Sequence, residues 1–438
     1  MKRFILTSTA LVLTIALVVV FSKPNDAIAA EVAVDTTITD SITERYNGSQ
    51  GLVFINDQTG FVFFKDANNS LVMSSTTNGG ATWNATKTID SQLDVVYYSV
   101  WWDGWTPPGT TTDMIHIAIV DRGNDDIWYA QYNILTGTSS TPIVTKIYNA
   151  SCSAGAGCNP AITKASNNVL YVAVADAQGR WIDQCSTNCT TASNWTGLSG
   201  GWYNTPSNDF VYLLPVPGNN NVLFVQWQGA TVYSNVYSAT SSSWINGSST
   251  QATNTITTNI ELDGTYDAQM GNIGFSQADG KIAFTIVDDA NNFTSADHDV
   301  KFFLYDASTN AWTTKTNVMT NNSFQGAALS YDETNDTWYS VYARRTNNLV
   351  ATSTNLYYRT SNDDGTTWSA ESSAINSTPD NITSLLVNLM SPERLGVAWA
   401  YETAPNADTL YYSDIIDITV GGGGGTPVIR EEEIYFMQ

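Results

Sequence analysis

The 438-residue chain has little positive charge: 18 Lys and Arg stand against 41 Asp and Glu, which gives a formal net charge of −23 at pH 7. A chain this acidic is repelled by nucleic acid and by anionic membrane surfaces, so we expect neither as a partner. Two interpretations of the acidity stay open. It either keeps an extracellular protein soluble or binds a cation, for which Ca²⁺ is the candidate cofactor.

The chain also has few charged residues overall, 13%, and lacks long Leu-, Glu- and Lys-rich stretches with apolar residues at helical spacing. This excludes a bundle of amphipathic helices. The polarity comes mainly from Thr, Ser and Asn, and aromatic residues make up 12%. Such a composition is typical of short strands joined by many turns, so we predict an all-β fold.

The two ends of the chain indicate its compartment. Met1, Lys2 and Arg3 precede a mostly apolar stretch over residues 4–21 and small residues at 27–29, which predicts a signal peptide or an uncleaved N-terminal anchor within residues 1–30. Residues 421–425 are all Gly, so residues 421–438 are predicted to be a flexible linker with an acidic tail, leading towards an anchor beyond this sequence. We therefore expect a secreted or cell-surface protein.

Residues 31–420 repeat a loose pattern of four short strands, which predicts a single β-propeller of about seven four-stranded blades. Six or eight blades stay open because the second and seventh repeats are incomplete. The seventh lacks an outer strand, and the segment at residues 32–38 is predicted to pair with it and close the ring, since this would remove an exposed sheet edge.

Two octets, T-T-N-G-G-A-T-W at residues 76–83 and S-N-D-D-G-T-T-W at residues 361–368, resemble the Asp-box, or BNR repeat, of the sialidase-like β-propeller superfamily. In such a turn Asn78 or Asp363 bonds the turn backbone, glycine permits positive φ, and the Trp packs between neighbouring sheets. Weaker copies end in Trp195, Trp244 and Trp312. The resemblance implies a structural role for these hairpins and no chemistry.

The four cysteines are Cys152, Cys158, Cys185 and Cys189, and their spacings match no common zinc site. In an exported chain they favour two disulfides. The repeat register places the first two in the link before the third blade and the other two in the outer hairpin of that blade, on the opposite face. We therefore predict the pairs Cys152–Cys158 and Cys185–Cys189.

A binding site is expected on the face, here called the funnel face, that carries the turn between the second and third strands of each blade and the links between blades. Aspartates at these strand ends either cap tight turns or bind a cation or sugar. The register places these residues on the funnel: Asp66, Asp121, Asp176, Trp227, Asp288, Arg344 and Tyr401. Close to them lie Arg122, Arg180, Asp289, His298, Arg345 and Glu402.

We expect first a non-catalytic propeller that binds an extracellular glycan or protein. The resemblance implies an alternative, a glycosidase of the exo-α-sialidase type, which needs three arginines for a substrate carboxylate, an acid, and a Tyr nucleophile with a Glu. The candidates are Arg122, Arg180, Arg344 or Arg345, Asp121 or Asp66, Tyr401 and Glu402. Two departures weaken this alternative: the family's Phe/Tyr-Arg-Ile-Pro motif is missing, and adjacent strand residues such as Tyr401 and Glu402 point to opposite faces. A surface-layer component is the third hypothesis.

Trp101, Trp102 and Trp105 form a second cluster, either core between blades or, on the face opposite the funnel, a platform for a partner. Several Asn-x-Ser/Thr sequons would permit glycosylation in an exported protein. They include Asn47, Asn68, Asn84, Asn149, Asn194, Asn246, Asn335 and Asn381.

Overall fold

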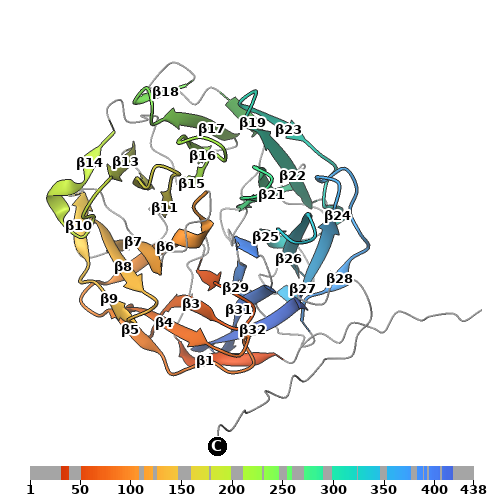
Figure 1. Ribbon diagram of the computed structural model, residues 1–438. Helices are drawn as coiled ribbons and strands as arrows, with labels where there is room; N and C mark the ends of the chain where they lie inside the picture. The colour runs from red at the N-terminus through yellow and green to blue at the C-terminus, as the bar shows by residue number, and fades with distance from the viewer. Residues whose placement is uncertain are drawn as a thin grey trace, which may run out of the picture. The chain divides into compact units, whose positions relative to one another are not determined.

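The computed structural model describes residues 31–38, 51–107, 113–121, 126–146, 159–176, 179–198, 211–228, 231–245, 254–258, 271–289, 298–322, 324–345, 353–375, 382–387, 389–391, 394–404 and 407–417, in places by backbone alone. Within the compact unit Ile28–Gly421, seven sheets of four or five strands, antiparallel except for one short added strand, are arranged in a ring (Figure 1). The prediction of a seven-bladed β-propeller is thereby confirmed.

The blades follow one another in chain order. Blade 1 contains β2 (Leu52–Phe54), β3 (Gly60–Lys65), β4 (Leu71–Thr76) and β5 (Lys87–Asp90). Blade 2 contains β6 (Val95–Trp102), β7 (Met114–Asp121), β8 (Ile127–Asn133) and β10 (Ile143–Lys146), with β9 (Thr138–Ser139) also on β8. Blade 3 contains β11 (Pro160–Lys164), β12 (Leu170–Asp176), β13 (Gly179–Cys185) and β14 (Thr196–Gly197). Blade 4 contains β15 (Val211–Pro215), β16 (Val222–Gln228), β17 (Thr231–Ser238), β18 (Ser243–Trp244) and β19 (Asn254–Thr258).

Blades 5 to 7 complete the ring. Blade 5 contains β20 (Gly271–Phe275), β21 (Ile282–Asp289), β22 (His298–Asp306), β23 (Ala311–Thr314) and β24 (Met319–Asn322). Blade 6 contains β25 (Phe324–Asp332), β26 (Thr337–Arg345), β27 (Ser353–Ser361) and β28 (Ser372–Ser373), with β30 (Met390–Ser391) added to β25 in parallel. Blade 7 contains β29 (Ile382–Val387), β31 (Arg394–Ala404), β32 (Ala407–Asp417) and β1 (Val32–Ile38). Two short 3-10 helices, η1 (Asp103–Trp105) and η2 (Ala192–Asn194), lie in the turns of blades 2 and 3.

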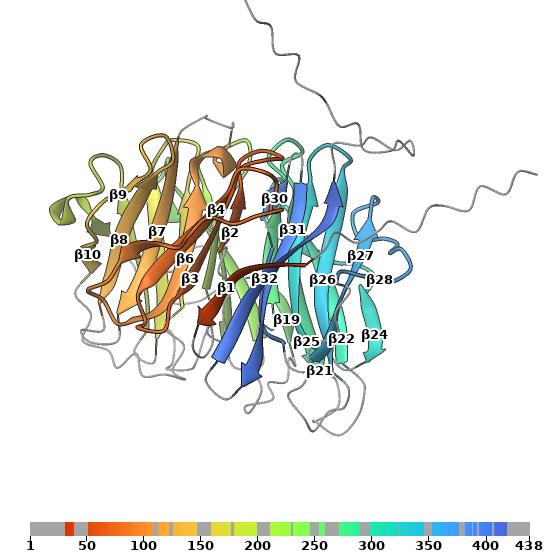
Figure 2. The same cartoon turned by 90° about the horizontal axis from the view of Figure 1, so that it is seen from below.

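The ring closes through the N-terminal strand, as the sequence predicts. Strand β1 pairs antiparallel with β32, with Val32 opposite Tyr412 and Asp35 opposite Leu410, and Figure 2 shows the two strands side by side. Ile38 is buried in a hydrophobic cluster that joins blade 7 to blade 1. The closing strand therefore completes a sheet and also seals an interface between blades.

Side chains alternate between the two neighbours of each blade, because successive residues of a strand point to opposite faces. In β26, Trp338 and Tyr342 belong to a cluster shared with blade 5, whereas Val341 and Ala343 belong to one shared with blade 7. The middle strands are thus apolar on both faces. This explains why the repeats show strongly apolar runs in place of simple alternation.

The two octets form the same turn. Asp363 Oδ1 accepts the Thr367 amide at 2.9 Å, and Asn78 Oδ1 accepts the Thr82 amide at 2.9 Å. Asp363 also accepts a hydroxyl bond from Thr367, whereas Asn78 donates its side-chain amide to the Thr82 hydroxyl, so either residue type completes the turn. The bonds from Thr367, followed by that from the Ser361 hydroxyl, hold the pKa of Asp363 below its usual range.

Glycine in each octet meets a geometric requirement and a packing requirement. Gly80 and Gly365 have φ of +88° and +76°, values that side-chain-bearing residues rarely adopt. A Cβ on Gly80 would overlap the Tyr412 ring, and a Cβ on Gly365 would overlap the Phe302 ring. Both aromatic rings belong to the preceding blade, so the octet turn is fitted closely against its neighbour.

The tryptophans that end these hairpins pack between neighbouring sheets, as predicted, and the structure shows that the neighbour is the preceding blade. Trp83 of blade 1 packs on Tyr412 of blade 7 at 5.2 Å between centroids, and Trp368 of blade 6 packs on Phe302 of blade 5 at the same distance. The weaker copies Trp195 and Trp312 likewise contact Tyr129 of blade 2 and Ser234 of blade 4. These hairpins are therefore structural links around the ring.

Replacing Ser361 by Ala is expected to lower the free energy of unfolding by about 1–2 kcal/mol, because the Gly365 amide would lose its acceptor in a buried turn. Urea unfolding of the Ser361→Ala variant would test this. Ser372→Ala, at an exposed position of the same blade, is the matched control and should change stability by less than about 0.5 kcal/mol. Equal stability of the two variants would contradict the structural role of the octet.

Candidate functional site

On the funnel face, Asp66 caps the turn between β3 and β4. Its Oδ1 accepts the amides of Asn68 at 2.8 Å and Ser70 at 2.9 Å. In the same turn the Asn69 carbonyl accepts the amide of Val95, the first residue of blade 2, at 2.9 Å. The Asp66 carboxylate thus fixes this turn, and the turn holds the link between blades 1 and 2.

Asp121 acts on the same link from the other side. It is the last residue of β7 and is 2% exposed, and its Oδ1 accepts the amide of Asp94 at 2.9 Å. Asp94 directly precedes Val95, so the Asp66 turn and Asp121 hold adjacent residues. The funnel-face aspartates are expected from the sequence either to cap tight turns or to bind a cation or sugar. Asp66 and Asp121 cap turns.

Asp288 and Arg344 are each engaged within their own blade. Asp288 is buried and forms an ion pair with Lys301 of the adjacent strand β22. Arg344 Nη2 lies 2.8 Å from Glu371 Oε2, and its guanidinium sits 4.9 Å from the centroid of the Tyr357 ring. A guanidinium already paired in this way is not poised to grip a substrate carboxylate.

Besides Arg344, Glu371 contacts a second residue of blade 6, Tyr342. The Tyr342 hydroxyl donates to Glu371 Oε2 at 2.9 Å, and burial together with the nearby carboxylate raises the pKa of Tyr342 above its usual value. Sequence reasoning missed Glu371 because it lies outside the repeat pattern, in the loop before β28. No local motif marks it.

The other predicted site residues lie outside the described side chains. Arg122 is not described at all, and the rest occupy strand positions known by backbone only: Asp176, Arg180, Trp227, Asp289, His298, Arg345, Tyr401 and Glu402. Within that backbone, Tyr401 and Glu402 take successive positions of β31, opposite Thr409 and Asp408. Among the side chains that the structure describes, no three His, Cys, Asp or Glu residues come together as metal ligands.

At the opposite face lies a buried polar network that the sequence analysis did not find. Asp103 Oδ1 lies 2.8 Å from His116 Nε2 and 2.7 Å from Lys164 Nζ, and Asp103 is 2% exposed. His116 Nδ1 is 2.6 Å from the Tyr129 hydroxyl, and burial, reinforced by Asp103, raises the pKa of Tyr129. The chain has 2 histidines in all, and this rarity is the one signal that could have drawn attention to His116.

The Trp cluster beside this network is core. Trp101 and Trp105 are fully buried, with ring centroids 5.7 Å apart, and Trp101 Nε1 donates to Thr106 Oγ1 at 3.0 Å. The alternative of an exposed partner platform is therefore wrong for these two residues. The register placed Trp105 on the correct face but could not show that its segment turns inward.

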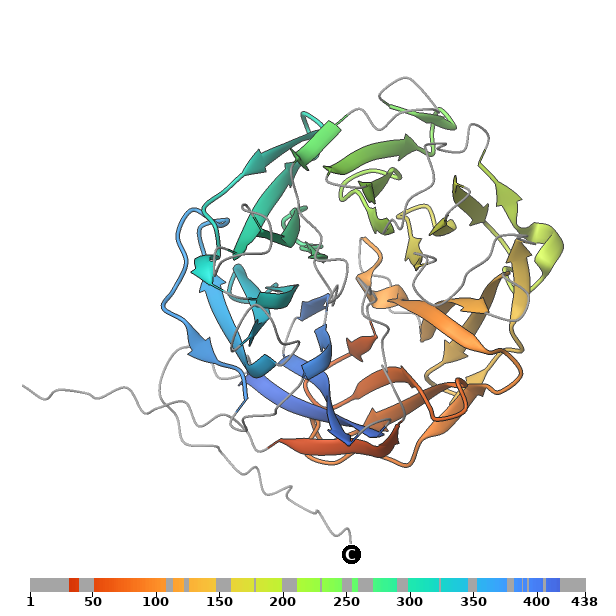
Figure 3. The ribbon, with the colours of Figure 1, turned by 180° about the vertical axis from the view of Figure 1, so that it is seen from behind.

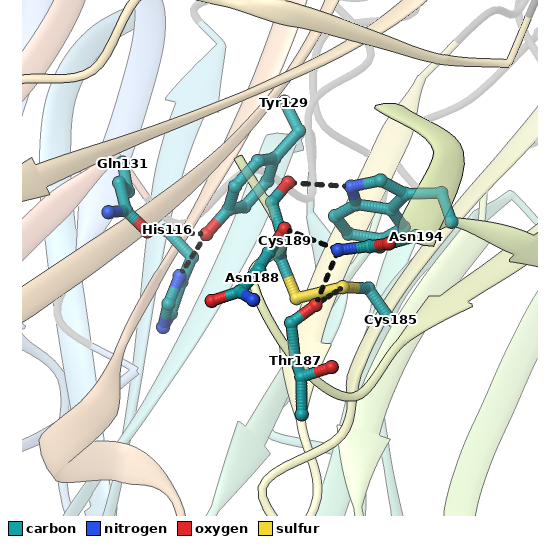
Figure 4. The surroundings of a disulfide bond; sticks show 9 residues. His116, Tyr129, Gln131, Cys185, Thr187, Asn188, Cys189 and Asn194 are labelled. Carbon is teal, nitrogen blue, oxygen red and sulfur yellow. Dashed lines mark hydrogen bonds between the residues drawn. A yellow bond between two sulfur atoms is a disulfide. The ribbon is translucent and has the colours of Figure 1, made fainter. Parts of the chain in front are cut away.

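The Cys185–Cys189 disulfide is present in the outer hairpin of blade 3, as predicted, with Cα atoms 5.7 Å apart (Figure 4). The Cys189 carbonyl accepts Trp195 Nε1 at 2.8 Å, and the Trp195 ring packs on Tyr129 of blade 2. Asn194 donates its side-chain amide to the carbonyls of Thr187 and Asn188. Cys152 and Cys158 lie outside the described residues.

Among the residues that the structure describes, no helix has the length and apolar character needed to span a bilayer. Of the predicted sequons in that part of the chain, Asn68 and Asn84 have exposed side chains, Asn68 at a turn of the funnel face. Asn194 and Asn335 instead use their side-chain amides in hydrogen bonds within turns.

No family model and no curated protein matches the sequence. Among solved structures, the chain is similar to the polysaccharide lyase Uly1, with 9% identity, a TM-score of 0.52, and coverage of 89% of this chain and 99% of that one. It is also similar to the hydrazine synthase of Kuenenia stuttgartiensis, with 10% identity, a TM-score of 0.49, and coverage of 84% and 96%. AofleA from Arthrobotrys oligospora matches with 10% identity, a TM-score of 0.44, and coverage of 80% and 87%. At such identity the likeness concerns the fold alone, and the chain is a seven-bladed β-propeller.

Proposed function

We propose that this chain is an exported, non-catalytic β-propeller that binds a glycan or protein partner at its funnel face. The observation that carries the proposal is a pair of buried amide side chains, Asn159 and Gln226, at the funnel-face end of the interface between blades 3 and 4. Asn159 precedes β11 and is 2% exposed; Gln226 lies opposite Val211, the first residue of β15, and is 1% exposed.

These two amides belong to one interface because β11 packs against β15. The Asn159 side-chain oxygen and nitrogen and the Gln226 Oε1 have no hydrogen-bond partner among the described residues. Leaving a buried amide unpaired is costly, and a ligand with hydroxyl or peptide groups would satisfy these atoms where its binding opens the end of the interface that buries them. Neutral donors and acceptors of this kind select a polar, uncharged group and supply no catalytic acid or base.

The charged candidates whose side chains are described support the same proposal. Asp66 and Asp121 are occupied as turn caps, and Arg344 is occupied by Glu371. The sialidase-type hydrolase remains the alternative, favoured by the octet turns with their Asp-box-like hydrogen bonds. The disulfide in blade 3 supports export, because such bonds persist mainly in oxidising compartments.

The test is a titration of residues 31–438 with a panel of neutral and sialylated oligosaccharides. A bound oligosaccharide should lose about threefold to tenfold in affinity to the Asn159→Ala variant, the usual effect of one hydrogen bond. Asn362→Ala, at an exposed position of an outer hairpin, is the control and should bind as the unaltered chain does. Equal affinity of the Asn159→Ala variant would contradict the amide site. Turnover of a fluorogenic α-sialoside would overturn the non-catalytic assignment in favour of the hydrolase.

A further inference from the structure

The turn between β6 and β7 in blade 2 begins with a segment, residues 103–106, that is mostly buried, although turns between strands ordinarily lie on the surface. Asp103, Trp105 and Thr106 are each at most 2% exposed. Figure 3 shows the orange segment after β6 extending towards the centre of the ring. Residues 103–106 are called the plug segment below.

The plug segment contacts a blade that is not its neighbour in the ring. Its Thr106 carbonyl accepts a hydrogen bond from Gln277 Nε2 at 2.8 Å, and Gln277 lies in the turn between β20 and β21 of blade 5. Blades 2 and 5 are three places apart in a ring of seven, so they face each other across the axis. A direct hydrogen bond therefore brings these two turns together near the axis.

Blade 6 holds in place the blade 5 turn that carries the donor, Gln277. Glu333, in the turn between β25 and β26, accepts the amides of Gln277 and Ala278, the second at 3.2 Å, and the Ser276 hydroxyl at 3.3 Å. One carboxylate thus fastens the blade 5 turn that holds Gln277. The contact across the axis is made between two turns that are each held independently.

A second segment reaches the same face of the ring. Strand β30 adds to the innermost strand of blade 6 in parallel, with Met390 opposite Tyr331. The preceding Leu389 is buried in the same hydrophobic cluster as Trp101 and Trp105. Leu389 thus connects this segment of blade 7 to the hydrophobic core that also contains the two Trp residues of blade 2.

The first residue of the plug segment, Asp103, belongs to the buried polar network of blades 2 and 3. Asp103 is bound by His116 from β7 and by Lys164 from the end of β11. The segment is consequently held by blade 3 at its start and by blade 5 at its end. Asp121 lies at the opposite end of β7 from this segment, on the funnel face.

We propose that the plug segment closes the axis of the propeller at the face opposite the funnel, which makes the axis blind-ended. A ligand can then reach the axis from the funnel face alone, and a polymeric ligand is bound by its end or across the funnel but is not threaded through the ring. This inference concerns the route of access and goes beyond the proposed function, since it holds for any ligand class.

Hydrogen–deuterium exchange of the full chain tests the proposal without a ligand. Residues 103–107 should exchange as slowly as the core strands and much more slowly than the exposed turn at residues 134–137. The Gln277→Ala variant should speed exchange in residues 103–107 about threefold to tenfold, the effect of one lost hydrogen bond. Gln58→Ala, an exposed glutamine in a blade 1 turn, is the matched control and should leave these residues unchanged.

Hydroxyl-radical footprinting of single tryptophans gives a second readout. Trp105 should be protected from oxidation in the native chain and lose protection in the Glu333→Ala variant, which releases the turn that carries Gln277. Exchange of residues 103–107 as fast as that of the exposed turn, or a Trp105 oxidised in the native chain, would overturn the plug. Either result would leave the glycan titration of the Asn159 site unaffected, so the two proposals fail separately.

Discussion

Replacing Asp103 by Ala is expected to lower the free energy of unfolding by about 3–5 kcal/mol. The substitution leaves the Lys164 ammonium and the His116 ring without the buried carboxylate that both contact at 2.7–2.8 Å. Removal of one partner from a buried ion pair is strongly destabilising, because the remaining charge stays desolvated and uncompensated. The plug segment begins at this residue, so its packing should loosen as well.

Urea unfolding of the full chain, followed by tryptophan fluorescence, measures the effect. Gln58→Ala, at an exposed position in a turn of blade 1, is the control and should cost less than about 0.5 kcal/mol. A double-mutant cycle with Lys164→Met separates the ion pair from the rest of the network: the double variant should recover at least about 1 kcal/mol, or about fivefold in the equilibrium constant, relative to the sum of the two single effects. Additive effects would show that the two residues do not act as a pair.

The parts of the fold that the sequence predicted are those coded locally. The octets at residues 76–83 and 361–368 carry their turn hydrogen bonds, glycines and Trp within eight residues, so the hairpins could be placed without knowledge of the ring. The Cys185–Cys189 bond is also local. Closure by β1 was predictable because the seventh repeat ended one strand short, and the unpaired edge of β32 needed a partner.

The parts that the sequence did not predict depend on contacts between distant residues. Thr106 and Gln277 are far apart in the chain, and nothing near Trp105 indicates that its turn forms a hydrogen bond with blade 5. In the same way, Lys164 forms an ion pair with Asp103 only because blades 2 and 3 are neighbours. A hydrophobic pattern shows that a Trp is buried but does not show what buries it.

The candidate site was predicted less well than the fold for a related reason. A repeat register places strand ends on one face, and it did so for Asp66 and Asp121, but it gives no information on which partner each side chain finds. Arg344 could be counted as a substrate-binding arginine until Glu371, from a different loop, was seen beside it. Site chemistry is set by such pairings between loops, which periodicity does not encode.

Removal of the closing strand β1 is expected to destabilise the propeller by at least about 3 kcal/mol. A chain that begins at residue 39 loses the buried Ile38 side chain, which alone is worth about 2–5 kcal/mol, and the hydrogen bonds to β32. It also exposes the edge of β32, an 11-residue strand whose unpaired backbone groups invite pairing with another copy. Compared with a chain that begins at residue 31, the shortened chain should unfold at lower urea concentration and elute as dimers or larger species.

The point variant Ile38→Asp isolates the packing contribution, because it keeps the backbone pairing but buries an uncompensated charge between blades 7 and 1. If the shortened chain stays monomeric and unfolds at the same urea concentration, closure of the ring by β1 contributes nothing to its stability.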